Sequence, residues 1–233
     1  MSKTADILFF GAHPDDVEIG VGGIVAKHAA NGYSVAICHL TDAELSSNGT
    51  VERRRQEAEE AAKILGVSLS IRLGFPDRGL TGSKEQLLKI TQVIRQLRPR
   101  VILAPYWQDR HPDHVACSRM VKEAAFDAGI QKRETPVDEP AHRTQQIYYY
   151  FINNIDQADI IVDVSDVYEK KSRALLSYNS QFSSGKGQIS TPLNQPTYLA
   201  MIRGRDQLWG HQIGALYGEG LVSAGPIKKE LLV

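Results

Sequence analysis

The hydrophobic positions in the first half of the chain alternate between two kinds of pattern. Short apolar runs are typical of buried strands, and longer segments with apolar residues three or four positions apart are typical of helices. The predicted strands cover residues 7–10, 35–40, 71–75 and 101–105, and the predicted helices cover residues 17–30, 50–65, 87–97 and 112–128. Gly66, Pro99 and Gly129 stand where three of these helices are expected to end.

Regular alternation of strands and helices predicts the fold class. Consecutive strands joined by helices pair in parallel through right-handed crossovers. We therefore expect an α/β protein with a Rossmann-like, doubly wound and mainly parallel sheet. In the common strand order 3-2-1-4-5, strands one and four are neighbours, and a ligand crevice opens at their carboxyl ends.

The second half of the chain is less regular. Strands are predicted over residues 146–152 and 160–164, and helices over residues 167–178 and 198–212. Residues 183–196 are rich in Ser, Gly, Pro and Gln and predict a long loop, which in compact domains is often functional. The length of 233 residues suits one domain over residues 1–233, with a core over about 5–130 and a small C-terminal extension over 145–233.

Composition narrows the range of partners and compartments. Lys+Arg and Asp+Glu both number 27, so no large basic surface for nucleic acid is expected. Cys38 and Cys117 are too few for a disulfide framework. The apolar run near the N-terminus is too short for a signal peptide, and no run approaches a membrane span of about 18 residues. We expect a cytoplasmic protein without membrane or nucleic-acid partners.

Two short segments concentrate histidine and aspartate at predicted strand-to-helix turns. Residues 11–16 have the sequence GAHPDD and follow the first strand, while residues 110–114 have the sequence RHPDH and follow the fourth. The expected strand order brings these turns together in the ligand crevice. His13 and Asp16 are three positions apart, as are His111 and His114, so each pair can share one helix face.

These residue types point to a catalytic metal site. Such a site uses three nitrogen or oxygen ligands and an open position, and hydrolysis also needs a base and an oxyanion donor. Simpler interpretations stay open for single residues: Asp15 or Asp16 alone can cap a helix, and His114 alone can be a buried core histidine. A dinucleotide site is disfavoured because the first turn lacks G-x-G-x-x-G and adjacent carboxylates would repel a pyrophosphate.

Residues 12–18 (AHPDDVE) and 111–114 (HPDH) resemble the LmbE-like, or PIG-L-like, zinc-dependent deacetylases. Segments 41–50, 76–80, 178–182 and 217–220 resemble one branch of that family, the N-acetylglucosaminyl-malate deacetylases of bacillithiol biosynthesis. The resemblance spans nearly the whole chain. It implies a hydrolase that removes the acetyl group from a small amino-sugar substrate, with one zinc ion per chain.

The resemblance also implies roles for individual residues in these motifs. His13, Asp16 and His114 match the zinc ligands of the family. Asp15 matches the general base, which accepts a proton from the attacking water and later passes one to the leaving amine. His111 matches the histidine that stabilises the oxyanion.

Further residues are expected to contact the substrate or support the site. The resemblance implies that Tyr198 polarises the carbonyl and that Arg54 contacts the substrate near the acyl pocket. Arg110 and Arg143 are candidates to bind a malate carboxylate, because arginine pairs bidentately with carboxylates. Asp113 either orients a histidine from behind or serves as a favourable charge at a helix start.

Several alternatives remain at this stage. The same chemistry can act on diacetylchitobiose or another amide conjugate, and Fe(II), Mn(II) or Co(II) can replace zinc at such ligands. A carboxylate-pair glycosidase would need no metal. A non-catalytic sugar- or metal-binding protein would not require Asp15 and His111, which argue against it. The family resemblance also implies a homo-oligomer, namely a hexamer.

Overall fold

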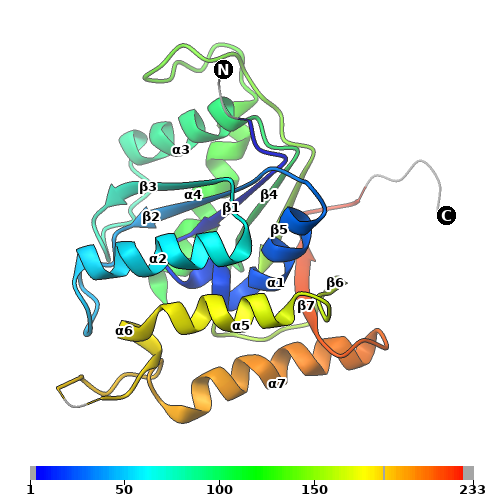
Figure 1. Ribbon diagram of the computed structural model, residues 1–233. Coiled ribbons are helices and arrows are strands. Elements are labelled where there is room, and N and C mark those ends of the chain that lie inside the picture. The colour runs from blue at the N-terminus through cyan, green and yellow to red at the C-terminus, as the bar shows by residue number, and fades with distance from the viewer. Residues whose placement is uncertain (1–3, 186, 228–233) are drawn as a thin grey trace.

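The computed structural model describes residues 4–185 and 187–227, so residues 1–3, 186 and 228–233 of the predicted domain lie outside the described residues. A sheet of seven strands in the order β3-β2-β1-β4-β5-β7-β6 forms its centre (Figure 1). β1 to β5 are parallel, and β7 is antiparallel to both its neighbours. The strands are β1 (Ile7–Gly11), β2 (Val35–Thr41), β3 (Leu69–Phe75), β4 (Val101–Pro105), β5 (Gln146–Tyr150), β6 (Ile160–Asp163) and β7 (Gly218–Ser223).

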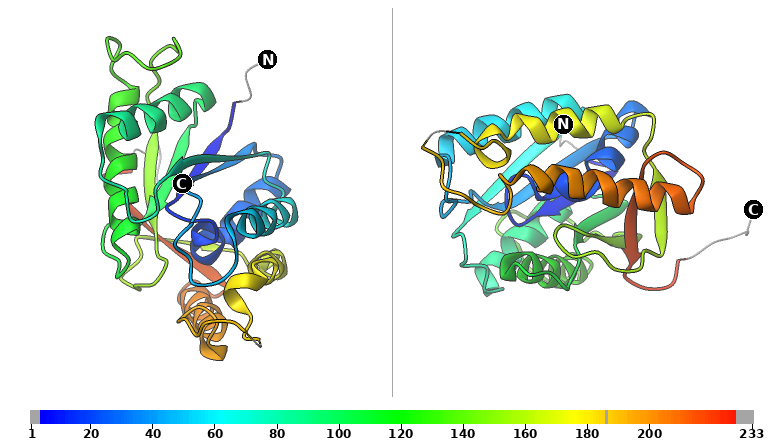
Figure 2. Two further views of the ribbon diagram at one scale, coloured as in Figure 1. Left: turned by 90° about the vertical axis from the view of Figure 1, so that its left-hand side faces the viewer. Right: turned by 90° about the horizontal axis from the view of Figure 1, so that it is seen from below.

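Helices cover both faces of the sheet. They are α1 (Asp16–Ala30), α2 (Val51–Leu65), α3 (Lys84–Leu97), α4 (Pro112–Ala128), α5 (Tyr168–Ser177), α6 (Asn179–Phe182) and α7 (Pro196–Gln212). α3 and α4 lie on one face and α1, α2 and α5 lie on the other (Figures 1 and 2), whereas α7 packs beside β7 and places Ile202 in one core and Trp209 in the other. None of the helices in the described part of the chain combines the length and apolar character needed to cross a membrane.

The central strands are buried on both faces, which explains their continuous apolar runs. Successive strand residues point to opposite sides, so Phe9 and Phe10 enter different cores. Phe10 packs in the layer that contains Ile90 and Met120, from the α3 and α4 side. Phe9 packs in the layer that contains Leu65, from the α2 side. The predicted doubly wound α/β fold and the strand order 3-2-1-4-5 are confirmed.

One strand was missed by the sequence patterns. β7 lies between β5 and β6 and contains Gly218 and Gly220, which weaken any strand signal. A Cβ atom at Gly220 would lie 2.7 Å from Cε2 of Trp209, so the glycine allows α7 to pack closely against this strand. The predicted strand at 160–164 therefore pairs with β7 and not with β5.

Element boundaries differ modestly from those predicted. α3 begins at Lys84, because the Ser83 side chain caps it by accepting from the Gln86 N–H. The helix predicted over 167–178 is followed at once by the short α6. Residues 183–185 and 187–195 form a loop as predicted, but Pro196 already belongs to α7, where it begins the helix at a position that suits proline.

Candidate metal centre and active site

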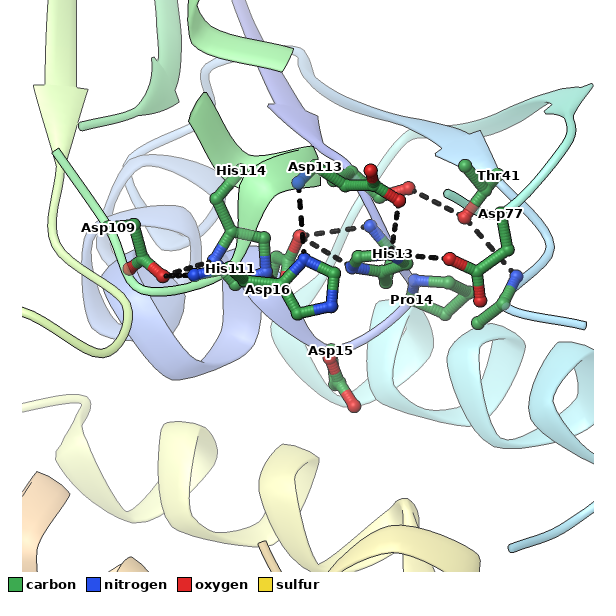
Figure 3. Close-up of polar contacts among 12 residues, drawn as sticks. His13, Pro14, Asp15, Asp16, Thr41, Asp77, Asp109, His111, Asp113 and His114 are labelled. Carbon is green, nitrogen blue, oxygen red and sulfur yellow. Dashed lines mark hydrogen bonds and ion pairs between the residues drawn. The ribbon is translucent and has the colours of Figure 1, made fainter. Parts of the chain in front are cut away.

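The two histidine-containing turns meet at the carboxyl ends of β1 and β4. These strands are paired, so the residues after Gly11 and Pro105 share one edge of the sheet. The ring centroid of His13 lies 4.7 Å from that of His111 and 5.5 Å from that of His114 (Figure 3). The convergence expected from the strand order is therefore present.

The Asp16 carboxylate lies between two imidazoles. Its Oδ2 is 3.7 Å from Nδ1 of His13, and its Oδ1 is 3.1 Å from Nε2 of His114. All three side chains are buried, and the rings of His13, His111 and His114 offer nitrogens within 4.8 Å of one another. Two imidazole nitrogens and one carboxylate oxygen form the donor set of a catalytic metal site, so a divalent ion fits these residues.

Carboxylates behind the imidazoles orient the rings. Nε2 of His13 is 3.2 Å from Oδ1 of Asp77 and 3.4 Å from Oδ2 of Asp113. Nδ1 of His114 is 3.1 Å from Oδ1 of Asp109. An imidazole that donates to a carboxylate through one nitrogen keeps the other nitrogen free as a metal ligand. The position of Asp113 therefore agrees with the expectation that it orients a histidine.

Asp77 and Asp109 had no assigned role in the sequence interpretation. Both follow strands that end at the same edge of the sheet, β3 and β4. A search for acidic residues just beyond every predicted strand, and not only beside the histidines, would have found them. Asp109 also accepts hydrogen bonds from both nitrogens of Asn153, at 3.0 Å each.

Charges within the cluster strongly shift the pKa values of the candidate metal-binding residues. Burial lowers the pKa of His114, but the carboxylates of Asp16 and Asp109 outweigh it and raise the pKa to about 9. Burial raises the pKa of Asp16, yet the positive charge of His114 and a hydrogen bond with His13 hold it well below its usual range. The site therefore favours positive charge, and a divalent cation competes with protons for the same nitrogens.

Asp15 is held in a separate position from the imidazole cluster. Its backbone has a φ of 104°, a region that non-glycine residues rarely adopt and that often marks functional sites. Its side chain points away from the imidazoles in Figure 3 and accepts a hydrogen bond from Nη2 of Arg54 at 3.0 Å. Burial raises the pKa of Asp15 to about 6, against the opposing charge of Arg54. Such a carboxylate can accept a proton near neutral pH.

His111 is poised as a neutral hydrogen-bond donor. It is the N-cap residue of α4, and its Nδ1 accepts from the backbone N–H of Asp113 at 3.2 Å. Since a backbone N–H can only donate, the proton of the neutral ring is on Nε2. Burial and the positive charges of His114 and His13 lower the pKa of His111. This arrangement suits stabilisation of an oxyanion.

A cavity of about 310 Å³ opens over these groups. Arg54, Arg110 and Tyr198 line it together with the histidines, and Tyr198 is buried although it comes from the distant helix α7. Arg143 does not line it: its side chain lies beside Gly129, beyond the end of α4 and before β5 begins. That is the opposite edge of the sheet, so the expectation that Arg143 grips the substrate is corrected.

Comparison with known proteins shows the family. The model of the PIG-L family, described as GlcNAc-PI de-N-acetylase, matches residues 8–125, a segment that includes both histidine-containing turns. This chain belongs to the PIG-L family. Diacetylchitobiose deacetylase of Thermococcus kodakarensis is 31% identical to it, over 92% of this chain and 81% of that protein.

Two further similarities extend over most of the chain. A probable N-acetyl-alpha-D-glucosaminyl L-malate deacetylase 2 of Bacillus subtilis is 26% identical over 75% of this chain and 82% of that protein. A conserved protein from Thermus thermophilus, known from a crystal structure, shares 36% sequence identity with this chain. The two structures superpose with a TM-score of 0.89 over 99% of each chain. The predicted family and enzyme class are confirmed: the protein is a deacetylase, a hydrolase of amide bonds.

Proposed function

We propose that this protein is a zinc-dependent N-deacetylase that hydrolyses the acetamide of an N-acetylglucosamine conjugate. The observation that carries the proposal is the buried set of His13, Asp16 and His114, which lies at a cavity beside a proton acceptor, Asp15, and a neutral donor, His111. Two imidazoles and one carboxylate suit zinc. The named activities of the relatives support an acetylated amino sugar as substrate.

Two substrates are supported by different observations. N-acetylglucosaminyl malate is the leading candidate, because the exposed Arg110 lines the cavity and arginine binds carboxylates bidentately. Diacetylchitobiose is the second candidate, because the relative with that activity shares 31% identity with this chain. Both molecules present an acetamide on a glucosamine ring, so the chemistry below serves either.

Different side chains around the cavity are assigned to metal binding and to proton transfer in amide hydrolysis. When bound to His13, Asp16 and His114, a zinc ion supplies Lewis-acid polarisation of the acetamide carbonyl and lowers the pKa of a water molecule. Asp15, held by Arg54, accepts the proton of the attacking water and returns a proton to the departing amine.

The developing negative charge on the carbonyl oxygen needs hydrogen-bond donors. Nε2–H of His111 can supply one, and the hydroxyl of Tyr198 can supply another from α7. Burial and the negative charge of Asp15 raise the pKa of Tyr198, so its hydroxyl keeps its proton at neutral pH. Each such donor is worth about 2–4 kcal/mol in the transition state.

The test measures release of free amine from N-acetylglucosaminyl malate and from diacetylchitobiose, with chelator and with zinc added back. We expect zinc-dependent release from at least one of them. Asp15→Asn should lower kcat about 10²–10⁴-fold while bound zinc is retained, because it removes the proton acceptor and keeps its shape. Glu59→Gln, on the exposed face of α2, is the matched control and should retain full activity.

The outcomes separate chemistry from substrate choice. Release from diacetylchitobiose and not from the malate conjugate would keep the mechanism and change the substrate. A zinc-loaded protein that releases no amine from any acetylated sugar would refute the proposed function. Full activity in the presence of chelator, with no metal bound, would refute the role given to His13, Asp16 and His114.

A further inference from the structure

The loop between α6 and α7 forms one wall of the active-site cavity. Thr191, Pro192 and Leu193 line the cavity beside Tyr198. Residues 187–195 of this loop contain no helix or strand, so side chains from elsewhere must hold the wall in place. An unrestrained wall would have to be ordered each time a substrate binds, which costs affinity.

The side chain of Asn48 binds this loop at the backbone of Ile189. Its Nδ2 donates to the carbonyl oxygen of Ile189 at 2.8 Å, and its Oδ1 accepts from the N–H of Ile189 at 2.9 Å. Asn48 belongs to the connection between β2 and α2 and is 8% exposed, whereas the Ile189 side chain is 60% exposed. The loop is therefore secured by a paired backbone contact and not by burial of the isoleucine.

Asn194 connects the same backbone group to the cavity-lining residue Thr191. Its Nδ2 donates to the same carbonyl oxygen of Ile189 at 2.9 Å, and its Oδ1 accepts from the N–H of Thr191 at 2.9 Å. Asn194 is also buried. Two asparagines thus meet at one carbonyl group, and the turn that presents Thr191 to the cavity is fixed relative to Asn48.

Asn48 is in turn anchored to the helices. Its carbonyl oxygen accepts from Nε2 of Gln181 at 2.8 Å, and the neighbouring Ser180 donates twice to the carboxylate of Glu57, at 2.8 and 2.6 Å. Gly49 has a φ of 81°, and a Cβ atom there would lie 2.9 Å from the Ser180 side chain. The connection between β2 and α2 therefore approaches α6 too closely for any residue except glycine.

We infer that Asn48 is a positioning residue for substrate specificity, which acts by fixing Thr191, Pro192 and Leu193 as a rigid cavity wall. The inference rests on the proposed function. The metal ligands and Asp15 are assigned to the acetamide, and we assign to the wall the part of the substrate beyond the acetylated ring. A preorganised wall lowers KM for substrates that extend to it and leaves the chemical step unchanged.

The first test compares wild type and Asn48→Ala, both zinc-loaded. The substrates are N-acetylglucosamine and the larger conjugate that the wild type hydrolyses, either N-acetylglucosaminyl malate or diacetylchitobiose. We expect KM for the larger conjugate to rise about tenfold, equivalent to about 1.4 kcal/mol. We expect kcat to stay within about twofold, and KM for N-acetylglucosamine to change less than about threefold. Asn31→Ala, which removes a side-chain hydrogen bond to the Lys27 carbonyl, is the control and should change neither.

A second readout does not depend on activity. Hydrogen exchange at the amides of Ile189 and Thr191 should be slow in the wild type and at least about tenfold faster in Asn48→Ala. Asn194→Ala removes the loop side of the same contacts and should act in the same direction, which covers the case that Asn48→Ala does not fold. If no acetylated sugar is hydrolysed, the proposed function fails, and exchange alone decides whether Asn48 fixes the wall.

Two results would overturn the inference. One is a fall in kcat for both substrates alike with KM unchanged, as expected if Asn48 only supports the folded state. The other is unchanged exchange at Ile189 and Thr191 in both variants.

Discussion

At the scale of single residues, the proposed metal ligands are held in place by carboxylates outside the proposed ligand set. Asp109 faces Nδ1 of His114 at 3.1 Å and accepts from the backbone N–H of His111 at 2.8 Å. Hydrogen bonds from Asn153 fix its carboxylate further. Although burial opposes ionisation of Asp109, His114 and these donors lower its pKa to about 2. The residue is therefore an anion that orients one ligand and connects it to the loop after β5.

This arrangement predicts the effect of Asp109→Asn. The carboxamide keeps the shape but loses the negative charge opposite His114, and loss of such a partner typically weakens metal binding about 10–100-fold. The dissociation constant for zinc can be measured by competition with a chromophoric chelator. Asp138→Asn, at an exposed position remote from the site, should bind zinc as the wild type does. Equal zinc affinity in Asp109→Asn and wild type would contradict this role.

At the scale of elements, close approach between α1 and the sheet sets the position of the turn that carries His13 and Asp16. A Cβ atom at Gly20 would lie 2.2 Å from Cδ2 of Tyr150. The Tyr150 ring cannot easily move, because it is fully buried and its hydroxyl donates to the carbonyl oxygen of Phe10 at 2.7 Å. Gly204 in α7 is the opposite case, because a Cβ atom there would have no neighbouring atom within 4 Å.

The two glycines therefore predict opposite results for the same substitution. Gly20→Ala should lower the free energy of unfolding by about 1–3 kcal/mol through overpacking against Tyr150. Gly204→Ala should raise it by about 0.4–1 kcal/mol, because alanine favours the helix and restricts the unfolded chain. Urea unfolding followed by circular dichroism measures both. A Gly20→Ala protein as stable as wild type would show that α1 can shift away from β5 at little cost.

At the scale of the whole molecule, a buried ionic cluster joins the C-terminal elements to the catalytic half. Nζ of Lys171 in α5 lies 2.7 Å from Asp206 in α7 and 2.6 Å from Glu219 in β7, and all three side chains are fully buried. Glu219 also accepts from the backbone N–H groups of Gly23 and Ile24, just after the irregular turn of α1. Elements α1, α5, α7 and β7 thus meet at one buried cluster, in which Lys171 is the cation beside Glu219 and Arg205 is a second cation beside Asp206, at 3.0 Å.

Removal of that lysine should destabilise the whole fold. Lys171→Met leaves the buried Glu219 carboxylate without a cation and Asp206 with Arg205 alone, so we expect the free energy of unfolding to fall by about 3–5 kcal/mol. Lys27→Met removes an exposed ion pair with Asp166 and should cost less than about 1 kcal/mol. Thermal and urea unfolding compare the two variants. If both substitutions lowered the free energy of unfolding by the same small amount, the buried cluster would contribute no more to stability than a surface ion pair.

The sequence by itself determined the parallel half of the sheet and most of the reactive groups. The strands were located from continuous apolar runs, because strands buried on both faces must be hydrophobic throughout, and their order was expected from the common doubly wound arrangement. His13, Asp15 and Asp16 were identifiable because they are consecutive or nearly so at one turn, as are His111 and His114 at another. Local spacing at the end of a strand is enough to predict that such groups face one crevice.

The tertiary structure alone decided which distant side chains support those groups. Asp77 and Asn48 act on His13 and Ile189 across long stretches of sequence, and no local pattern encodes such contacts. β7 could not be recognised in the sequence, because its glycines lower the strand propensity. The reason for glycine at position 220 is the close packing against Trp209, which only the tertiary structure shows. Arg143 was misplaced for a related reason: an exposed arginine has no periodic signal, and only the direction of β5 shows at which edge of the sheet it lies.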